Sequence, residues 1–408
     1  MKALIAGFSI GKEVWGRVKS KFTRSRPGSN GVTLEIQEIP EPELPAPDWV
    51  KIRPIMSGIS CSDEDMVLSG DPYAFGPYVS FPFVPGNETF GIVTDIGEHV
   101  ENLELGERVI FDPILSCRVR AVEPLCPSCA SGEPSFCRNF GRGVLGPGMM
   151  IGGCKDTGGG WGYSLVAHKS QVRPVPSRME SDHVLLVPEF TRALRAVLQN
   201  PPGSADRVII VGARSLGLLT LRALQILDLD RNTLVVAENP HEADAARKLG
   251  ATEVALDAGP GTACDAVARF TEGTVRYPEV GKIVVEGGAD LVYETTGSGE
   301  QIEDAARFTG ERKTLVQVAP VHSRPVSMVT FGLKGIGVRS YGFSGLESYH
   351  GEVTDTFDLA LDMASQHGLP HEDLLTHRFT IEQHAEAFST LSNRAGFGAI
   401  KVIFSHVV

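Results

Sequence analysis

Four cysteines between residues 117 and 137 have a spacing that predicts a metal site. Cys126 and Cys129 form a C-x2-C pair, with Cys117 before it and Cys137 after it. Four thiolates at this spacing can surround one zinc ion, and four protein ligands leave no open position, so such a site is structural. Clustered cysteines within an odd total of seven favour a metal over disulfides. The alternative is a set of inert buried thiols.

A second segment, GARSLG, has the position and spacing of a dinucleotide fingerprint. Its first glycine permits the tight turn, its last permits close helix packing, and the helix start offers N–H groups to a pyrophosphate. Arg214 replaces the middle glycine of G-x-G-x-x-G, and it either crowds the phosphates or supplies them with a cation. The loop residues predicted to bind the cofactor are Gly212, Arg214, Ser215, Leu216 and Gly217.

Glu238 follows Gly217 by about 20 residues, where the fingerprint expects an acid that accepts hydrogen bonds from the adenosine ribose. A carboxylate there repels a 2′-phosphate. The sequence therefore predicts NAD or NADP as cofactor and slightly favours NAD. The alternative is that Glu238 is only a solvated residue at a strand end.

The elements that must position these residues divide the chain into two kinds of structure. The first 182 residues contain short strands, such as 49–53 and 91–94, between turns rich in Pro and Gly, which predicts a mostly-β domain. From residue 183, uninterrupted apolar strands alternate with helices, which indicates a parallel sheet covered on both faces. The strands are predicted at 208–211, 233–237, 291–293 and 314–318, and the helices at 216–227 and 242–249.

After residue 334 the pattern becomes mixed. It predicts helices at 354–366 and 381–391 and a last strand at 399–404. This tail could complete the parallel sheet or fold back onto the first domain.

The composition is that of a globular chain with room for two packed domains. Its 408 residues are 42% hydrophobic and 22% charged, and the net charge of −12 argues against nucleic acid or an anionic membrane as partner. No apolar run approaches the roughly 20 residues of a membrane-spanning helix. Residues 2–8 are predicted to form a strand rather than a signal peptide, and the predicted location is the cytoplasm.

Five segments together resemble the medium-chain dehydrogenase/reductase superfamily, the relatives of zinc-type alcohol dehydrogenases. They are MSGISCSD at 56–63, PGNE at 85–88, TGGGW at 157–161, YETTG at 293–297 and LTHRF at 375–379. The resemblance covers nearly the whole chain in the expected order. It implies an α/β protein in which a doubly wound parallel Rossmann domain is joined to a GroES-like, mostly-β domain.

The implied domains are a GroES-like catalytic domain at 1–182, with a cysteine-rich lobe at about 112–140, and a Rossmann domain at 183–334. Residues 335–408 are expected to return and complete the catalytic domain.

The three positions that hold the catalytic zinc in this superfamily carry Ser60, Asn87 and Pro188 in this chain. Hydroxyl and amide oxygens are poor zinc ligands compared with thiolate and imidazole. A rearranged metal site could use the neighbouring residues Cys61, Glu88 and Glu189. A one-residue slip in a strand turns the side chain to the opposite face, so the rearranged site is the less favoured alternative.

Zinc-free members of the superfamily polarise their substrate by hydrogen-bond donors, and the resemblance implies candidates for this role. Asn87 could donate to a developing oxyanion, Ser62 aligns with the proton-relay hydroxyl, and Asp65 aligns with a nearby polar relay position. The alternative is that these side chains only satisfy backbone groups. The predicted catalytic residues are Ser60, Ser62, Asp65 and Asn87.

The resemblance also implies cofactor contacts outside the glycine loop. Val318 and Ala319 end the strand that abuts the nicotinamide, and Lys401 falls at a position that is often basic near the pyrophosphate. Together with Arg214, Lys401 would give two cations for the diphosphate.

The sequence thus predicts an NAD(P)-dependent oxidoreductase without catalytic zinc that acts on a small alcohol or ketone, an imine or an activated alkene. A homodimer is expected from the resemblance. The alternatives are a non-redox enzyme that re-uses the cleft, and a binding or scaffolding protein with a degenerate cofactor site.

Overall fold

The apolar segments between residues 208 and 340 form one six-stranded sheet in which every pairing is parallel. The computed structural model describes residues 1–8, 32–68, 76–257, 261–320 and 325–406. In spatial order the strands are β10 (Glu253–Leu256), β9 (Thr233–Ala237), β8 (Val208–Val211), β13 (Ala289–Glu294), β14 (Thr309–Gln317) and β15 (Gly337–Ser340).

Helices cover both faces of this sheet, which explains why its central strands read as uninterrupted apolar runs. One face packs against α7 (Ser215–Ile226) and α8 (Pro240–Lys248), and the other against α9 (Thr262–Thr271), α10 (Gly299–Phe308) and α11 (Val329–Lys334). The chain order reverses between β8 and β13, the point at which sheets of this kind bind ligands beyond the carboxyl ends of their strands. The doubly wound domain is confirmed.

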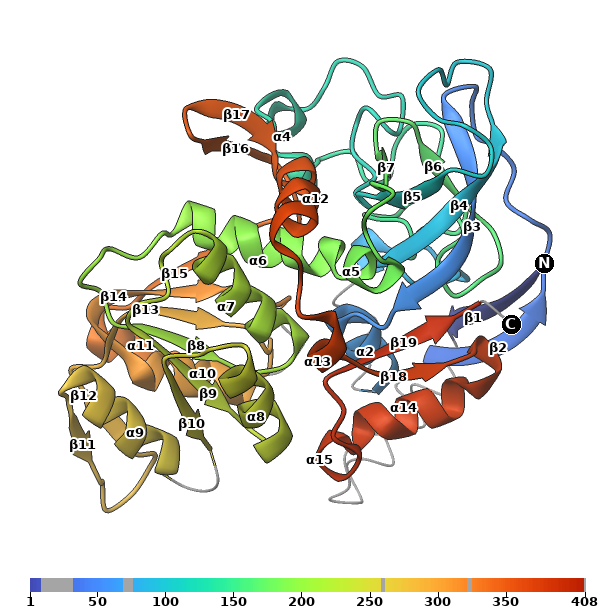
Figure 1. The fold of residues 1–408 in the computed structure, drawn as a ribbon. Helices are drawn as coiled ribbons and strands as arrows, with labels where there is room; N and C mark the ends of the chain where they lie inside the picture. Colours follow the sequence, from blue (N-terminus) through green and yellow to red (C-terminus); the bar gives the residue numbers. More distant parts are fainter. Residues whose placement is uncertain (9–31, 69–75, 258–260, 321–324, 407–408) are drawn as a thin grey trace.

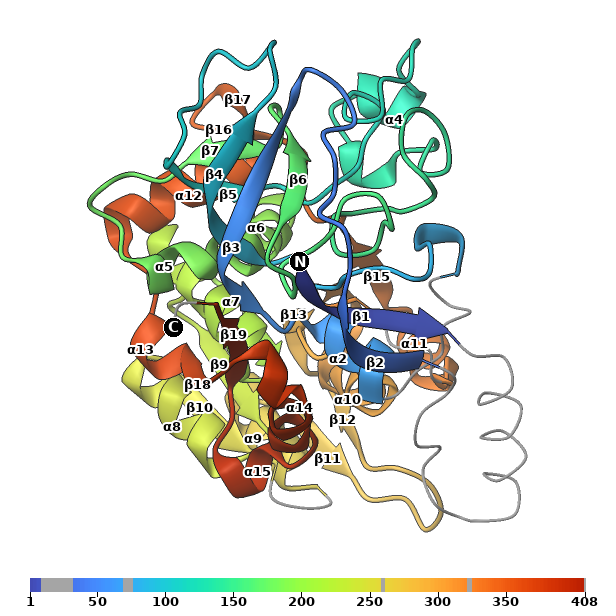
Figure 2. The same cartoon turned by 90° about the vertical axis from the view of Figure 1, so that its right-hand side faces the viewer.

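A second, seven-stranded sheet takes strands from both ends of the chain (Figures 1 and 2). Its path runs β18 (Leu375–Phe379), β19 (Lys401–Ser405), β3 (Trp49–Gly58), β4 (Thr89–Ile96), β5 (Arg108–Phe111) and β7 (Val172–Pro174), and β6 (Leu165–His168) also pairs with β3. The tail therefore folds back onto the first domain, because β19 pairs antiparallel with β3.

The return begins later than the sequence suggested. Residues 335–408 were expected to belong to the catalytic domain, but β15 within them pairs with β14 in the parallel sheet. The boundary at residue 334 is therefore wrong, and the chain leaves the parallel sheet after Ser340.

Smaller elements complete the mostly-β part. The strand expected at residues 2–8 is present as β1 and pairs antiparallel with β2. The other elements are β1 (Lys2–Phe8), β2 (Val32–Glu38), α2 (Cys61–Leu68), η1 (Gly76–Tyr78), α4 (Pro127–Ala130), η2 (Pro134–Phe136), α5 (Ser181–Leu185), β11 (Thr274–Arg276), β12 (Val284–Glu286), β16 (Leu346–Tyr349), β17 (Glu352–Asp355), α12 (Thr356–His367), α13 (His371–Leu374), η3 (Ile381–Gln383), α14 (His384–Ser392) and α15 (Arg394–Phe397). None of the described helices is both long enough and apolar enough to cross a membrane.

Helix α6 (Val187–Gln199) lies where the two parts meet (Figure 1). It is strongly amphipathic, and most of its residues are buried. Three charged residues spaced by three, Glu189, Arg192 and Arg195, recur along it and can share one side of a helix. The Arg195 guanidinium lies 2.6 Å from Glu133 and 3.3 Å from Glu347, so it ties the cysteine-rich lobe to the β16–β17 hairpin.

Candidate active site

The four cysteines of the lobe come together as their spacing predicts. Their sulfur atoms all lie within 4.8 Å of one another, and this is the only such cluster of potential ligands among the described residues. Backbone N–H groups point at the sulfurs, including Arg138 to Cys126 at 3.4 Å and Asn139 to Cys137 at 3.3 Å. Hydrogen bonds of this kind favour thiolates, and four sulfur donors suit zinc. The residues present therefore fit a structural zinc ion.

Two serines and an aspartate form a hydrogen-bonded chain at the start of α2. The Ser60 and Ser62 hydroxyls lie 2.9 Å apart, and Ser60 Oγ donates to Asp63 Oδ2 at 2.6 Å. Asp63 also accepts from the Ser60 backbone N–H at 3.1 Å. Burial raises the pKa of Asp63 to about 6, although the hydrogen bonds from Ser60 lower it. A carboxyl with this pKa can accept or release a proton near neutral pH.

The carboxylate in this chain of hydrogen bonds belongs to Asp63, rather than to the predicted Asp65. Asp65 is 2% exposed and does not line the cavity described below. Asp63 belongs to the quoted motif GISCSD, where it matches the aspartate of the superfamily segment G-I-C-G-S-D. This match could have identified Asp63 as a site residue from the sequence alone.

Asn87 is buried and lines the same cavity as Ser62 and Asp63. Its side-chain amide donates to the Met150 sulfur at 3.4 Å. A thioether is a weak acceptor, so this donor can be exchanged for a stronger acceptor, such as a substrate oxygen.

A buried ion triad lies beside the position of the expected catalytic zinc. The ammonium of Lys401 lies 2.6 Å from Glu88 Oε2 and 2.7 Å from Glu189 Oε2. The Lys401 side chain is 2% exposed, so its charge is shielded from water, and the two carboxylates raise its pKa against the effect of burial. Gly58 makes room for the triad, because a Cβ there would stand 2.5 Å from Glu88 Oε2.

The triad changes two of the predicted roles. Lys401 was expected near the pyrophosphate, but its ammonium is buried between two carboxylates. In the rearranged metal site, Glu88 and Glu189 would have been ligands together with Cys61, but the ammonium takes the place between them that a divalent ion would need.

The glycine loop has the geometry that a phosphate cradle requires. Gly212 has a φ of +98°, and a Cβ on Gly217 would stand 2.0 Å from the Gly212 carbonyl oxygen. Ser215 and Leu216 open α7, whose first N–H groups have no partner within the helix. These residues fit the diphosphate of a dinucleotide. Ser215 also donates from its hydroxyl to Glu189 at 2.7 Å, which links the loop to the triad.

Arg214 turns away from this cradle toward the predicted ribose site. Its guanidinium lies 2.9 Å from Glu238 Oε2 and 3.7 Å from Glu242. The other Glu238 oxygen accepts from Gln301 at 2.9 Å. Arg214 was expected to join Lys401 beside the diphosphate or to crowd the phosphates, but its guanidinium pairs with Glu238 instead. The pairing neutralises part of the charge of Glu238.

Val318 and Ala319 lie where the resemblance implies, at the carboxyl end of β14. Both are buried, and the Val318 N–H donates to the Glu294 carbonyl at 2.8 Å. The next residue, Pro320, lines a cavity between the two parts of the molecule. The end of β14 thus connects the nucleotide domain to that cavity.

This cavity has a volume of about 180 Å³ and mostly apolar walls. The loop 70–81 contributes Tyr78, Val79 and Phe81 to the wall, and the loop 143–162 contributes Met149 and Met150. Residues 70–75 of the first loop lie outside the described residues. The polar part of the wall is made by Ser62, Asp63, Asn87 and Arg192. Arg192 was missed, although a charge within an apolar helix stripe was a visible signal.

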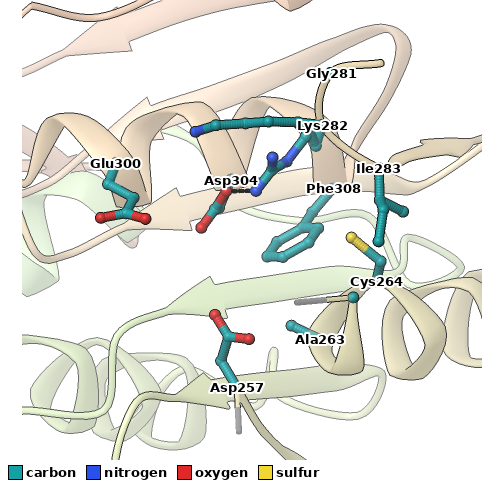
Figure 3. Close-up of a pocket in the computed structure, with 11 residues that line it drawn as sticks. Asp257, Ala263, Cys264, Gly281, Lys282, Ile283, Glu300, Asp304 and Phe308 are labelled. Atoms are coloured by element: carbon teal, nitrogen blue, oxygen red, sulfur yellow. Dashed lines mark ion pairs between the residues drawn. The ribbon is translucent and has the colours of Figure 1, made fainter. Parts of the chain in front are cut away.

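A larger polar groove lies between α9 and α10 on one face of the parallel sheet (Figure 3). Its volume is about 500 Å³, and it carries charges of both signs, including Asp257 and Glu300 opposed to Lys282 and Arg307. Asp257 follows β10, and its N–H donates to the Ala237 carbonyl, so the groove adjoins Glu238.

Comparison with known proteins gives the same fold and family. Residues 46–177 match the model of the alcohol dehydrogenase GroES-like domain. L-idonate 5-dehydrogenase of Vitis vinifera is 27% identical over 379 residues, which cover 91% of this chain and 92% of that protein.

Two solved structures show the same architecture. The 2R,3R-butanediol dehydrogenase of Bacillus subtilis has a TM-score of 0.69 at 21% identity, covering 92% of this chain and 97% of that one. A short chain alcohol dehydrogenase from Escherichia coli CFT073, solved with NADH, has a TM-score of 0.70 at 19% identity, covering 99% of both chains.

The GroES-like match, the doubly wound domain and the closing strands from the chain end lead to one family. Residues 46–177 belong to the alcohol dehydrogenase GroES-like domain family, and the similarity of the chain as a whole to known dehydrogenases supports the medium-chain dehydrogenase/reductase superfamily. It is an oxidoreductase of the NAD(P)-dependent type.

Proposed function

We propose that this enzyme transfers a hydride between NAD(P) and a small alcohol or ketone, an imine or an activated alkene without a catalytic zinc ion. The observation that carries the proposal is the chain from Ser62 through Ser60 to Asp63, which reaches the wall of an apolar cavity. Ser60 and Asn87 are hydrogen-bonding residues at positions where zinc enzymes of the superfamily carry ligands.

The residues of the cavity can carry out the proton half of such a reaction. Bound nicotinamide supplies or accepts the hydride. In alcohol oxidation, the substrate hydroxyl proton passes to Ser62, from Ser62 to Ser60 and from Ser60 to the Asp63 carboxylate. Asn87 donates to the substrate oxygen while that oxygen carries negative charge. In reduction the same steps run in reverse.

We further propose NAD as the preferred cofactor, because Glu238 stands at the predicted ribose position and the part of its charge that Arg214 does not neutralise repels a 2′-phosphate. NADH should bind at least tenfold more tightly than NADPH in a fluorescence titration. Glu238→Gln should narrow that difference, because the neutral amide removes the repulsion. Glu253→Gln, at the amino end of β10 and thus at the opposite edge of the sheet, is the control and should leave it unchanged.

The titration also tests the proposal as a whole. The ion pair between Arg214 and Glu238 is the feature that a degenerate nucleotide site would show. Failure of both NADH and NADPH to bind at millimolar concentration would contradict the dehydrogenase function and leave a binding or non-redox role.

The cysteine lobe is proposed to hold structural zinc. We expect about one zinc per chain by elemental analysis, lost in Cys126→Ser/Cys129→Ser, since a site with two ligands removed cannot complete a tetrahedron. The lobe of that variant should be cut earlier in limited proteolysis. Cys264→Ser, which changes a buried cysteine outside the lobe, is the control and should keep its zinc. About two zinc ions per chain would contradict the zinc-free catalytic site.

The cytoplasmic location and the homodimer remain predictions from the sequence. Gel filtration with light scattering would test the dimer.

A further inference from the structure

The cavity between the two parts is lined by a cation, Arg192, that has no hydrogen-bond or ion-pair partner among the described residues. Most of its wall is apolar, with Met66, Phe83 and Met149 among the lining residues, yet Arg192 also lines it. No described residue forms a hydrogen bond or an ion pair with Arg192. The acidic group of the lining, Asp63, accepts hydrogen bonds from Ser60 instead.

Arg192 differs in this respect from the charged residues that precede and follow it on α6, which both have ion-pair partners. Glu189, three residues before Arg192, is paired with Lys401, and Arg195, three residues after it, is paired with Glu133 and Glu347. Each of these carboxylates thus has another cation, not Arg192, as its direct partner.

Arg192 is also partly removed from water. Its side chain is half-buried, and its guanidinium carbon lies 5.5 Å from the centroid of the Phe343 ring. Burial lowers the pKa of Arg192, against the effect of Cys61, Glu88 and Glu189, because its charge has lost hydration. An arginine does not lose its proton in a protein, so the charge remains and favours an anion from outside.

We propose that Arg192 binds the carboxylate of the substrate, and that the enzyme therefore acts on a small organic acid with an apolar body. This inference rests on the proposed function and names its substrate class. A planar guanidinium matches a carboxylate with two parallel hydrogen bonds. A phosphate monoester carries close to two charges and calls for more than one cation, and the buried Lys401 is already paired.

The size and lining of the cavity agree with such a substrate. Its volume of about 180 Å³ lies below the ~300–1,000 Å³ of pockets that enclose drug-sized ligands. Arg192 lines the same cavity as Ser62 and Asp63, the two ends of the proton chain, so one substrate can meet both the cation and the chain.

Calorimetric titration of the full chain with matched acids and amides tests the proposal. The probes are benzoate against benzamide, and 4-methylpentanoate against its amide, with and without NADH. Each acid should bind at least tenfold more tightly than its amide. Arg192→Gln should abolish that preference, and Arg192→Lys should keep part of it. Arg231→Gln, which removes an exposed arginine paired with Asp228, is the control and should leave the preference intact.

Three results would overturn the proposal: acids that bind no better than amides, acid binding that survives in Arg192→Gln, and NADH binding that Arg192→Gln weakens as much as acid binding. The last would show that Arg192 faces the cofactor. NADH binding with no acid preference would reject the role of Arg192 alone. An acid preference that depends on Arg192, in a chain that binds neither NADH nor NADPH, would reject the dehydrogenase function but leave the anion site.

Discussion

The Lys401→Met variant is expected to be less stable than the wild-type enzyme by about 3–5 kcal/mol at pH 7. The substitution keeps much of the side-chain volume but leaves the Glu88 and Glu189 carboxylates buried without their shared cation. An uncompensated buried charge is costly because the protein interior cannot replace the lost hydration. Urea unfolding followed by circular dichroism measures the difference.

Two further variants separate charge from packing. The triple variant Lys401→Met/Glu88→Gln/Glu189→Gln removes the anions as well and should recover more than half of the lost stability. Lys248→Met breaks an exposed ion pair with Asp373 and should change the stability by less than about 1 kcal/mol. A Lys401→Met variant as stable as the wild-type enzyme would show that the triad does not hold the site together.

In the zinc-free site proposed for this enzyme, the triad provides a buried cation. In zinc enzymes of the superfamily, the ion supplies positive charge at the meeting point of the two domains. Here Lys401 of β19 supplies it to Glu88, just before β4, and to Glu189 of α6. The other Glu189 oxygen accepts a hydrogen bond from Ser215 in the glycine loop. One ammonium thus connects the chain end, the catalytic domain and the nucleotide loop.

Local sequence patterns were sufficient for the elements of the nucleotide domain. The strands expected at 208–211 and 233–237 are present with those bounds as β8 and β9, because apolar runs of this length fit strands buried on both faces. The glycine loop could also be predicted, since its geometry is local. The domain boundary predicted at residue 334 is wrong, because β15 pairs with β14 through tertiary contacts that the periodicity of the sequence does not show.

The site could be predicted only where one segment or one motif determines it. The cysteine cluster and the serines at the start of α2 could be predicted in this way, because each set comes from one short segment. The pairing of Lys401 with Glu189 spans 212 residues, and no local pattern predicts which distant charges meet. Arg192 had a local signal, a charge within an apolar helix stripe, but its lack of a partner among the described residues is a tertiary property that the sequence does not show.

Asp63→Asn is expected to change the pH dependence of stability and to remove most of the activity. The pKa of Asp63 is raised from 3.8 to about 6 in the folded chain, mainly by burial. Between these pH values the folded chain keeps a proton that the unfolded chain has released, so the free energy of unfolding falls as the pH rises through this range. The contribution amounts to about 1 kcal/mol between pH 5 and pH 8, and to about 3 kcal/mol over the whole titration.

Asparagine cannot titrate but keeps an oxygen that accepts from Ser60. Asp63→Asn should therefore be more stable than the wild-type enzyme at pH 8, and the difference should shrink toward pH 5. Urea unfolding at four pH values checks this. Asp112, whose pKa burial also raises, is present in both proteins and cancels in the comparison. Glu88 titrates in both proteins too, but its pKa should fall slightly in Asp63→Asn, because the Asp63 charge is one of the causes that raise it.

Asp65→Asn is the matched control, since it removes an equal charge from a buried position on the same helix. Asp65→Asn should keep the fall in the free energy of unfolding with rising pH that Asp63 produces. If Asp63→Asn retains the full wild-type slope, the pKa of Asp63 is not raised and its place at the end of the proton chain is lost.

Activity should move in the opposite direction to stability. Once an alcohol substrate has been found, Asp63→Asn should lower kcat by about 10²-fold or more, because the amide cannot take the proton that Ser60 passes on. In the wild-type enzyme, the rate of alcohol oxidation should rise with pH through about 6, where Asp63 becomes a base. A variant that is more stable at pH 8 yet nearly inactive would mean that this buried carboxylate is retained for proton transfer rather than for folding.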